Sequence, residues 1–425
     1  MVCDSPTLNT GFARVAQNLL NRWLDKGVAV DVWAIGYAGW PHPLQRRAQL
    51  FPAAPANSPW HSTERLAALL NLIRSGNYTH VWIIQDTFLL AQAEFPKYLK
   101  VVCKEKHVRT LLYFPVDATL ERGWTEIIAA VDTPVAYTEY GKGEAIRANP
   151  ALADKGIRVL PHGVDTQIYF PMDDRRKLRR ELFHGGWIGD DDILLLNVNA
   201  HQRRKDIARS LQVLRALRAM GLPAKLYLHM PSYSDGDMTD LKMVADQLRL
   251  TQGKEWQVAD KLLINGHEVP AFRNGHGVAG EEHLNRLYNA ADIFLTTTLG
   301  EGWGLTPTEA LAAGCPVAMP AHTACQEIML GLKERGQENF IRLEIEAEGT
   351  VMPIDNSRLR PRVHVQAAAV TIAAACAAGL KRAPLNKEVK RWLSWNRIAG
   401  EWWRYFHEVD RVDVQSQGIV TKEGE

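Results

Sequence analysis

Two glutamates flank a glycine-rich stretch in the second half of the chain. Glu301 and Glu309 are separated by seven residues, and Gly300, Gly302 and Gly304 lie beside or between them. A carboxylate accepts paired hydrogen bonds from neighbouring hydroxyl groups, and glycine lets the backbone approach a ligand closely. These residue types therefore suit a ligand that carries vicinal hydroxyls.

The stretch over 295–320 has the pattern of a strand, a glycine-rich turn, a helix and a second strand. We expect Thr306 to cap the helix and Pro307 to be its first residue. The unpaired amides at a helix start bind anions such as a diphosphate. A nucleotide sugar has a diphosphate and two vicinal diols, so the pattern predicts a site for one. Taken singly, Glu309 also fits a capping box with Thr306, and Glu301 fits a solvated loop carboxylate.

Short apolar runs alternate with helical periodicity, which is typical of parallel strands joined by crossover helices. The runs are 80–84, 110–114, 135–137 and 158–160 in the first part, then 193–198, 225–230, 261–264, 292–297 and 316–319. The pattern predicts an α/β fold of two Rossmann-like, doubly wound domains. Because such sheets bind ligands at the carboxyl ends of their strands, we expect the site in a central cleft that both domains face.

The first domain is expected over 1–165 and the second over 166–385. Only three residues precede the opening loop of the first domain, so its first strand is expected to be either short or trimmed. Aromatic residues at helical spacing predict a terminal helix over 386–412, and 413–425 is expected to be a flexible tail.

The composition narrows the class of protein. No run of about 18 apolar residues is present and the start lacks the pattern of a signal peptide, so a soluble, cytoplasmic protein is expected. The five cysteines are scattered, which argues against a disulfide framework and a zinc site. The net charge of +2 does not indicate a polyanionic partner.

The segment 301–309 resembles the Glu-x7-Glu motif of the retaining glycosyltransferases of family 4, which have the GT-B fold. Residues 4–20 are similar to that family's opening turn and helix, 158–171 to its interdomain link, 197–206 to its donor-phosphate segment and 395–406 to its terminal helix, which crosses back to the first domain. The resemblance implies a metal-independent hexosyl- or pentosyltransferase whose first domain binds the acceptor and whose second domain binds the nucleotide sugar.

The resemblance also implies roles for individual residues. Glu301 contacts and orients the donor sugar, Glu309 holds the ribose, and Arg204 and Lys205 neutralise the leaving diphosphate, where developing charge is largest. Alternatively, the basic run is a solvated helix start. Further donor contacts are expected from Thr10, Gly11, Arg203, Gly302, Trp303, Gly304, Leu305 and Thr306.

Asp117 follows a predicted strand of the first domain, at the cleft edge where many relatives carry a histidine. It is a candidate for a sugar or acceptor contact or for a base. A turn aspartate is the alternative, because aspartate is common in turns. The departure from histidine weakens any role that the family gives to that side chain.

Two other patterns resemble binding motifs. The acidic segment 189–193 precedes a core strand and favours a polar turn over a metal site, so no metal is expected. The glycines at 300–304 lack the spacing of a dinucleotide fingerprint, which disfavours an oxidoreductase. We therefore expect no cofactor, and a UDP- or GDP-linked sugar as the co-substrate.

The sequence leaves the acceptor and the oligomeric state open. A glycan, lipid-linked or small-molecule acceptor is the first hypothesis. Because the opening segment resembles family members carried by bacteriophages, which act in the host cytoplasm, DNA with hydroxymethylated pyrimidines is the second. Basic clusters that would then contact phosphates are Arg175, Arg176, Lys177, Arg179 and Arg180, and Arg358, Arg360 and Arg362. A non-catalytic nucleotide-sugar-binding protein is the third hypothesis.

Overall fold

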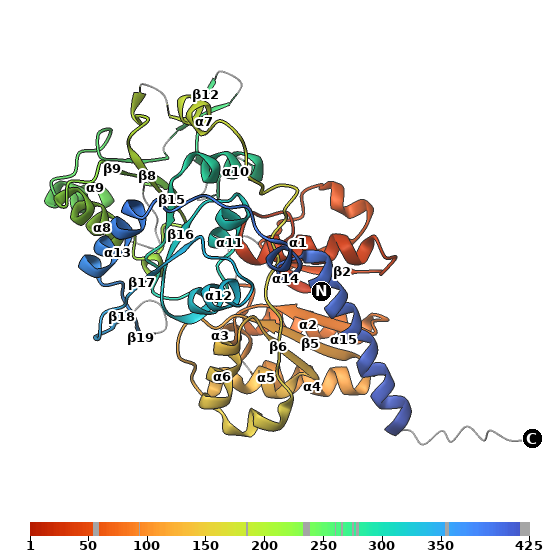
Figure 1. Ribbon diagram of the computed structural model, residues 1–425. Helices are drawn as coiled ribbons and strands as arrows, with labels where there is room; N and C mark the ends of the chain where they lie inside the picture. The colour runs from red at the N-terminus through yellow and green to blue at the C-terminus, as the bar shows by residue number, and fades with distance from the viewer. Residues whose placement is uncertain are drawn as a thin grey trace, which may run out of the picture. The chain divides into compact units, whose positions relative to one another are not determined.

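The computed structural model describes residues 1–53, 59–92, 94–183, 186–232, 239–259, 261–264, 267–273, 276–277, 280–352 and 357–416. The chain forms two compact units (Figure 1). The first comprises Met1–Val116, Leu120–Gly163 and Leu393–Glu425, and the second comprises Asp117–Thr119 and Val164–Trp392.

A seven-stranded parallel sheet forms the centre of the first unit, in the order β3-β2-β1-β4-β5-β6-β7. The strands are β1 (Val2–Asp4), β2 (Asp31–Ile35), β3 (Gln49–Pro52), β4 (His80–Ile84), β5 (Arg109–Phe114), β6 (Thr133–Ala136) and β7 (Arg158–Val159). The first strand has three residues. It nevertheless lies inside the sheet, between β2 and β4.

Helices cover this sheet on both faces. The helices of the unit are α1 (Gly11–Leu24), α2 (Thr63–Ser75), α3 (Thr87–Leu90), α4 (Phe95–Glu105), α5 (Glu126–Ala130), α6 (Glu139–Ala148) and α15 (Trp395–Ser416), with 3-10 turns η1 (Pro43–Arg46), η2 (Gly123–Thr125) and η3 (Pro150–Lys155). Leucine, isoleucine and valine side chains of α2, α4 and α5 form one core with the strands.

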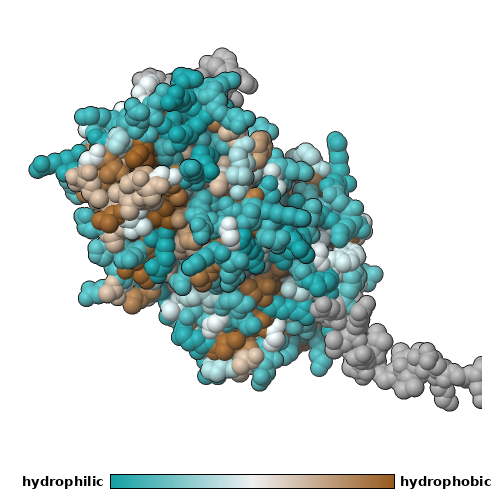
Figure 2. All heavy atoms as spheres, viewed as in Figure 1, coloured by the Kyte–Doolittle hydropathy of each residue, from teal (hydrophilic) through white to brown (hydrophobic). Residues whose placement is uncertain are grey.

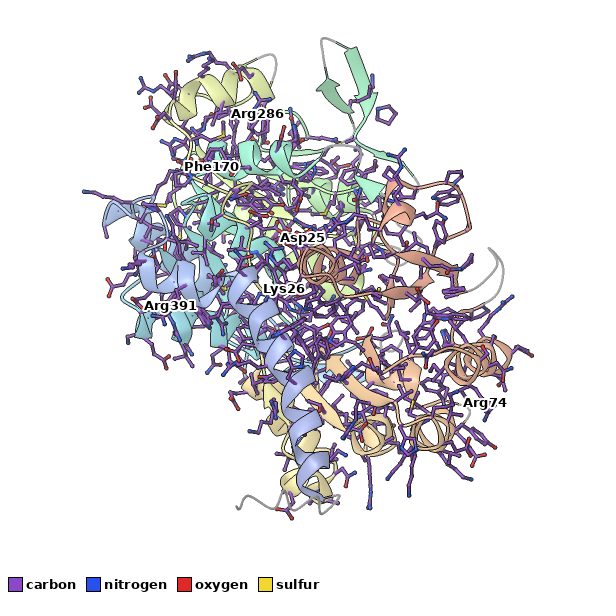
Figure 3. The ribbon with its side chains drawn as sticks, turned by 90° about the vertical axis from the view of Figure 1, so that its right-hand side faces the viewer. Asp25, Lys26, Arg74, Phe170, Arg286 and Arg391 are labelled. Atoms are coloured by element: carbon purple, nitrogen blue, oxygen red, sulfur yellow. The ribbon has the colours of Figure 1, made fainter. Side chains whose placement is uncertain are left out.

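An aromatic cluster joins α1 and α15 to β4. The ring of Trp82 packs edge-on against Trp23 and Trp402, at centroid distances of 5.4 and 5.5 Å. Lys26, labelled in Figure 3 beside α15, lies 5.2 Å from the ring of Trp403. Edge-on aromatic pairs stabilise a fold by more than the apolar area that they bury. Through these contacts α15 completes the core of the first unit.

The second unit has a six-stranded parallel sheet in the order β10-β9-β8-β15-β16-β17. Its strands are β8 (Ile193–Val198), β9 (Ala224–His229), β10 (Trp256–Val258), β15 (Ile293–Leu295), β16 (Val317–Pro320) and β17 (Phe340–Leu343). The chain runs outward from β8 to β10 and returns to the other side of β8 at β15. This reversal is the switch point at which doubly wound sheets bind ligands.

The helices of the second unit are α7 (Arg175–Leu182), α8 (Ile207–Ala219), α9 (Leu241–Gln247), α10 (Glu281–Ala290), α11 (Leu305–Ala312), α12 (Thr323–Glu334), α13 (Val365–Ala377) and α14 (Lys387–Trp392), with the 3-10 turn η5 (Arg203–Lys205). α8 and α13 pack apolar residues on the sheet. The predicted class, two α/β units with parallel sheets, is therefore confirmed.

One predicted strand lies outside the parallel sheet. The run 261–264 was expected in the parallel sheet, but β11 (Lys261–Ile264) pairs antiparallel with β12 (His267–Pro270) in a separate hairpin, and β10 holds the sheet edge instead. Small two-stranded sheets also form from β13 (Phe272–Arg273) with β14 (His276–Gly277), and from β18 (Thr350–Met352) with β19 (Arg358–Arg360). A short apolar run does not show whether its strand joins the central parallel sheet or a separate hairpin.

The terminal segment expected as one helix over 386–412 forms two, α14 and α15. α14 ends in the second unit, and α15 begins in the first. α15 continues to Ser416, and the rest of the expected tail, 417–425, lies outside the described residues.

Most of the surface visible in Figure 2 is hydrophilic, and its hydrophobic residues form separate patches. Within the described ranges, no helix combines the length and apolar composition that a membrane span needs.

Candidate functional site

The glycine-rich turn between β15 and α11 positions the first predicted site residues. Gly304 is the N-cap of α11, with φ 109° and ψ 74°, a conformation that favours glycine. The expected cap at Thr306 is therefore wrong, since Leu305 begins the helix and Pro307 is its third residue. No side-chain cap hydrogen bond forms, so the capping box with Glu309 is absent too. The first amides of the helix still lack intrahelical acceptors, as in any α-helix.

Glu309 lies on α11 and is 3% exposed. Its Oε2 accepts a hydrogen bond of 2.9 Å from the hydroxyl of Tyr288, on the neighbouring α10. The bond to a neutral donor orients the carboxylate without neutralising its charge. Tyr288 was not predicted, because nothing in the sequence of α10 indicates which residue of α11 its side chains contact.

The loops that follow β8 and β15 are joined by hydrogen bonds. The amide of Leu299 donates to the carbonyl of Arg204 at 2.7 Å, and Oγ1 of Thr297 donates to the carbonyl of Asp206 at 2.9 Å. Asp206 has φ 43°, and this left-handed conformation turns the chain from η5 into α8. The turn places Lys205 beside the loop that carries Glu301.

Glu301 is buried between two cations. Lys205 Nζ donates to its Oε1 at 2.5 Å, and Arg204 Nη1 donates to its Oε2 at 3.1 Å. Burial raises the pKa of Glu301, but Lys205 and Arg204 outweigh burial and lower it to about 2. The pKa of Lys205 is itself lowered, because burial exceeds the opposing effect of Glu301. Glu301 is therefore an anion at neutral pH that accepts hydrogen bonds.

Asp117, whose contacts assign it to the second unit, has guanidinium groups at both carboxylate oxygens. Oδ2 lies 3.2 Å from Arg204 Nε, and Oδ1 lies 3.2 Å from Arg360 Nη2. A Cβ at Gly300 would lie 2.0 Å from the Asp117 carbonyl oxygen, so only glycine fits there. These ion pairs disfavour the hypothesis that Asp117 acts as a base.

These contacts connect five charged side chains into one cluster: Arg204, Lys205 and Arg360 with Glu301 and Asp117. Cations gathered in a largely buried site attract an anionic ligand. The structure thus brings together the four residues predicted to be catalytic and adds Arg360.

Thr10 and Gly11 begin α1 in the first unit. Thr10 caps the helix, because its Oγ1 accepts from the Ala13 amide at 3.1 Å and donates to Asp4 Oδ2 at 2.6 Å. Burial raises the pKa of Asp4 against the opposing hydrogen bonds from Thr10 and Gln85. The place of Thr10 and Gly11 beside a donor phosphate or an acceptor stays a prediction.

The remaining predicted donor contacts lie around the same loops. Gly302, Leu305 and Thr306 are partly exposed at the start of α11, and Arg203 is partly exposed in η5. The side chain of Trp303 is 4% exposed, and its ring packs against Trp392 at a centroid distance of 6.1 Å. The packing of Trp303 therefore supports the turn from inside.

The basic clusters proposed for DNA phosphates are largely engaged within the second unit. Arg175 and Arg179 both pair with Asp292, and the Arg179 side chain is 3% exposed. Arg360 is 1% exposed and pairs with Asp117. Arg362 Nε lies 3.2 Å from Asp206 Oδ2. Arg179 and Arg360 are thus internal ion-pair residues, which corrects their assignment to a phosphate-binding surface.

The acidic segment 189–193 forms a turn before β8, as expected. Asp192 Oδ2 accepts from the Gly189 amide at 2.7 Å and lies 2.8 Å from Lys225 Nζ. Across the described ranges, no group of three or more histidine, cysteine, aspartate or glutamate side chains is placed to hold a metal ion.

Part of the chain matches a known family. Residues 251–339, which include Glu301 and Glu309, match the family model described as glycosyl transferases group 1. Over 174 residues the chain is 24% identical to mannosylfructose-phosphate synthase of Agrobacterium fabrum, which covers 40% of this chain. The chain thereby spans about a third (34%) of the length of that relative.

Two solved structures share the fold over most of the chain. Sucrose-phosphate synthase from Thermosynechococcus elongatus has a TM-score of 0.64 at 15% identity, covering 94% of this chain and 92% of that one. Anabaena Alr3699/HepE, in complex with UDP and glucose, has a TM-score of 0.64 at 12% identity, covering 96% and 98%. The fold is GT-B, and with the family model it supports a glycosyltransferase of group 1 as the class of this protein.

Proposed function

We propose that this protein transfers a sugar from a nucleotide sugar to an acceptor hydroxyl, with retention of the anomeric configuration. The supporting observation is the charge cluster around Glu301, where Lys205 and Arg204 hold an anionic carboxylate beside the start of α11. The two cations Arg204 and Lys205 suit a diphosphate whose negative charge grows as the bond to the sugar breaks.

Each residue then has a role. Glu301 accepts hydrogen bonds from hydroxyls of the donor sugar, and Arg204 and Lys205 bind the departing diphosphate. Glu309, oriented by Tyr288, accepts from the ribose hydroxyls. The acceptor oxygen bonds to the anomeric carbon as the bond to the phosphate oxygen breaks, and the acceptor proton passes to the leaving phosphate. No metal is needed, because side chains supply the positive charge.

The proposed acceptor is a glycan, a lipid-linked sugar or a small molecule. Two of the similar proteins are named as synthases of sugar phosphates, so phosphorylated sugars come first in an acceptor screen. The ion pairs of Arg179 and Arg360 remove part of the support for DNA. The presence of Glu301, Glu309, Arg204 and Lys205 together disfavours a non-catalytic binding protein.

The test is a thermal-shift panel of UDP, GDP, ADP and their glucose conjugates. A ligand at 100 times its Kd adds about 2.7 kcal/mol of stability. Stabilisation by one nucleotide identifies the donor, whose turnover is then measured with sugar, sugar-phosphate, lipid-linked and hydroxymethylated DNA acceptors. No stabilisation by any nucleotide, together with no turnover, would contradict the proposal.

A further inference from the structure

The turn between β16 and α12 contains an unusual backbone conformation. Thr323, the first residue of α12, has φ 47°. A side chain that branches at Cβ rarely adopts this left-handed conformation, because its atoms crowd the backbone. Glycine would adopt it without strain. Strain of this kind persists where the surrounding structure requires it, and it clusters at functional sites.

The hydroxyl of Thr323 contacts the main chain of Glu301. The Glu301 amide donates to Thr323 Oγ1 at 3.1 Å, and the Glu301 carbonyl accepts from the Ala324 amide at 3.4 Å. One turn therefore holds both sides of the Glu301 residue. Since Lys205 and Arg204 hold the carboxylate, the main chain and the side chain of Glu301 are fixed by different elements.

His322 orients the Thr323 hydroxyl. His322 Nδ1 lies 3.2 Å from Thr323 Oγ1, and the imidazole is 6% exposed. Burial lowers the pKa of His322 to about 4, so the ring is neutral at pH 7. Because Oγ1 accepts from the Glu301 amide, we assign its proton to a hydrogen bond with Nδ1. This assignment places the imidazole proton on Nε2.

We propose that Thr323 is a positioning residue for the transfer reaction, whose hydroxyl fixes Glu301 against the donor sugar. The inference rests on the proposed function. A glycine would remove the strain but not supply the hydroxyl, so the strained threonine is explained by the hydrogen bond that it makes. A displaced Glu301 lowers the rate of transfer, because catalysis depends on the placement of such groups to within about 1 Å.

Three substitutions at one position test this. Thr323→Val keeps the branched shape and removes the hydroxyl, Thr323→Ser keeps the hydroxyl, and Thr323→Gly removes both hydroxyl and strain. The measurement is release of nucleoside diphosphate from the glucose conjugate that the thermal-shift panel selects. We expect Thr323→Val and Thr323→Gly to lower kcat about tenfold, the value of one hydrogen bond, with the nucleotide Kd unchanged, and Thr323→Ser to stay near wild type.

Thr371→Val is the matched control. The Thr371 hydroxyl donates to the Ala367 carbonyl within α13, away from the site. It should leave kcat unchanged. A further signature is the melting temperature of Thr323→Gly, which should stay level or rise while its kcat falls, because strain is released. If kcat falls in all three variants only in step with the melting temperature, the role of Thr323 is merely structural and the inference is overturned.

A double-mutant cycle with Glu301→Gln separates the inference from the proposed function. If Thr323 acts through Glu301, adding Thr323→Val to Glu301→Gln lowers kcat no further. Additive losses in an otherwise active enzyme would refute the positioning role and leave the proposed function standing. A wild-type protein that turns over no nucleotide sugar overturns both.

Discussion

The two units begin with the same topology but place different chemistry at the same turn. In both sheets the first strand, β1 or β8, lies at the switch point and leads into the first long helix, α1 or α8. In the first unit that turn carries the neutral Thr10 and Gly11 beside the half-buried Asp4. In the second it carries Arg203, Arg204 and Lys205.

The difference predicts different roles for the two turns. A turn with two cations facing Glu301 suits an anionic diphosphate. A threonine cap that is hydrogen-bonded to a half-buried carboxyl offers no positive charge. We therefore expect substitutions at the β8 turn to change turnover, and substitutions at the β1 turn to change chiefly stability.

The largest effect is expected for Lys205→Ala. Removing a preorganised charge that stabilises a transition state lowers kcat by about 10²- to 10³-fold, and we expect a smaller change in nucleotide Kd. Lys225→Ala is the control, because Lys225 is a partly buried lysine of the same unit, on β9, 2.8 Å from Asp192. The measurement is the steady-state kcat of both variants. An equal fall in kcat for Lys205→Ala and Lys225→Ala would contradict a special role of the β8 turn.

Glu301→Gln should lower kcat about 100-fold, since the neutral amide loses charged hydrogen bonds to the sugar worth roughly 2–3 kcal/mol. Binding of the free nucleotide, followed by calorimetry, should change less. Glu255→Gln removes a buried carboxylate that pairs with Arg218 outside the site, and its kcat should match wild type. If Glu301→Gln loses nucleotide binding in the same proportion, Glu301 does not act on the sugar.

Glu309→Ala should raise the donor KM by about 10- to 100-fold with little change in kcat, because a charged hydrogen bond to the ribose is worth roughly 1.5–3 kcal/mol. Tyr288→Phe removes only the hydroxyl that orients Glu309 and should give a smaller rise in KM. The measurement is donor saturation for both variants. A fall in kcat at constant KM would reverse the roles proposed for Glu301 and Glu309.

Acid titration of stability tests the charge state of Glu301. Its pKa falls from 4.5 to about 2 on folding, so the carboxylate stabilises the fold above pH 4.5, and the stabilisation is lost as the pH falls toward 2. The shift corresponds to at most about 3 kcal/mol, reduced by the opposing cost of burying Lys205. Denaturant melts across this range should show a shallower loss for Glu301→Gln than for wild type.

The smallest catalytic effect is expected for Thr10→Ala. Loss of the cap lowers the free energy of unfolding by about 1 kcal/mol, while the donor KM stays within about twofold because the turn holds no cation. Thermal melts and donor saturation measure the two quantities. A tenfold rise in KM would mean that the first unit also binds the donor phosphates, and would break the comparison between the turns.

The sequence predicted the fold because its signals are local. Parallel strands appear in the sequence as apolar runs, and the glycine-rich stretch that ends at Gly304 indicates a turn. The helix cap was wrongly predicted at Thr306, because threonine favours that position but the left-handed conformation of Gly304 starts the helix earlier. The sequence pattern assigned Lys261–Ile264 to the main sheet, because a short apolar run does not specify its strand partner.

The site was predicted in part. Glu301 could be selected from the carboxylates and glycines around it, and Arg204 and Lys205 from their resemblance to the basic pair of the family and their place after a predicted strand. Tyr288, Thr323 and Arg360 could not be, since each acts through a neighbour that is distant in sequence, and a backbone angle such as that of Thr323 leaves no mark in the residue types. Arg360 was noticed, but its burial beside Asp117 reverses the role that a basic cluster suggests.

The membership of α15 in the first unit has a consequence for synthesis. The ribosome makes the strands of the first unit early, but it makes the helix that covers Trp23 and Trp82 only after the whole second unit. The second unit, built from a nearly continuous segment, is therefore complete before α15 emerges. Until then the nascent first unit exposes an apolar aromatic face, and chains truncated before α15 should depend on chaperones to stay in solution.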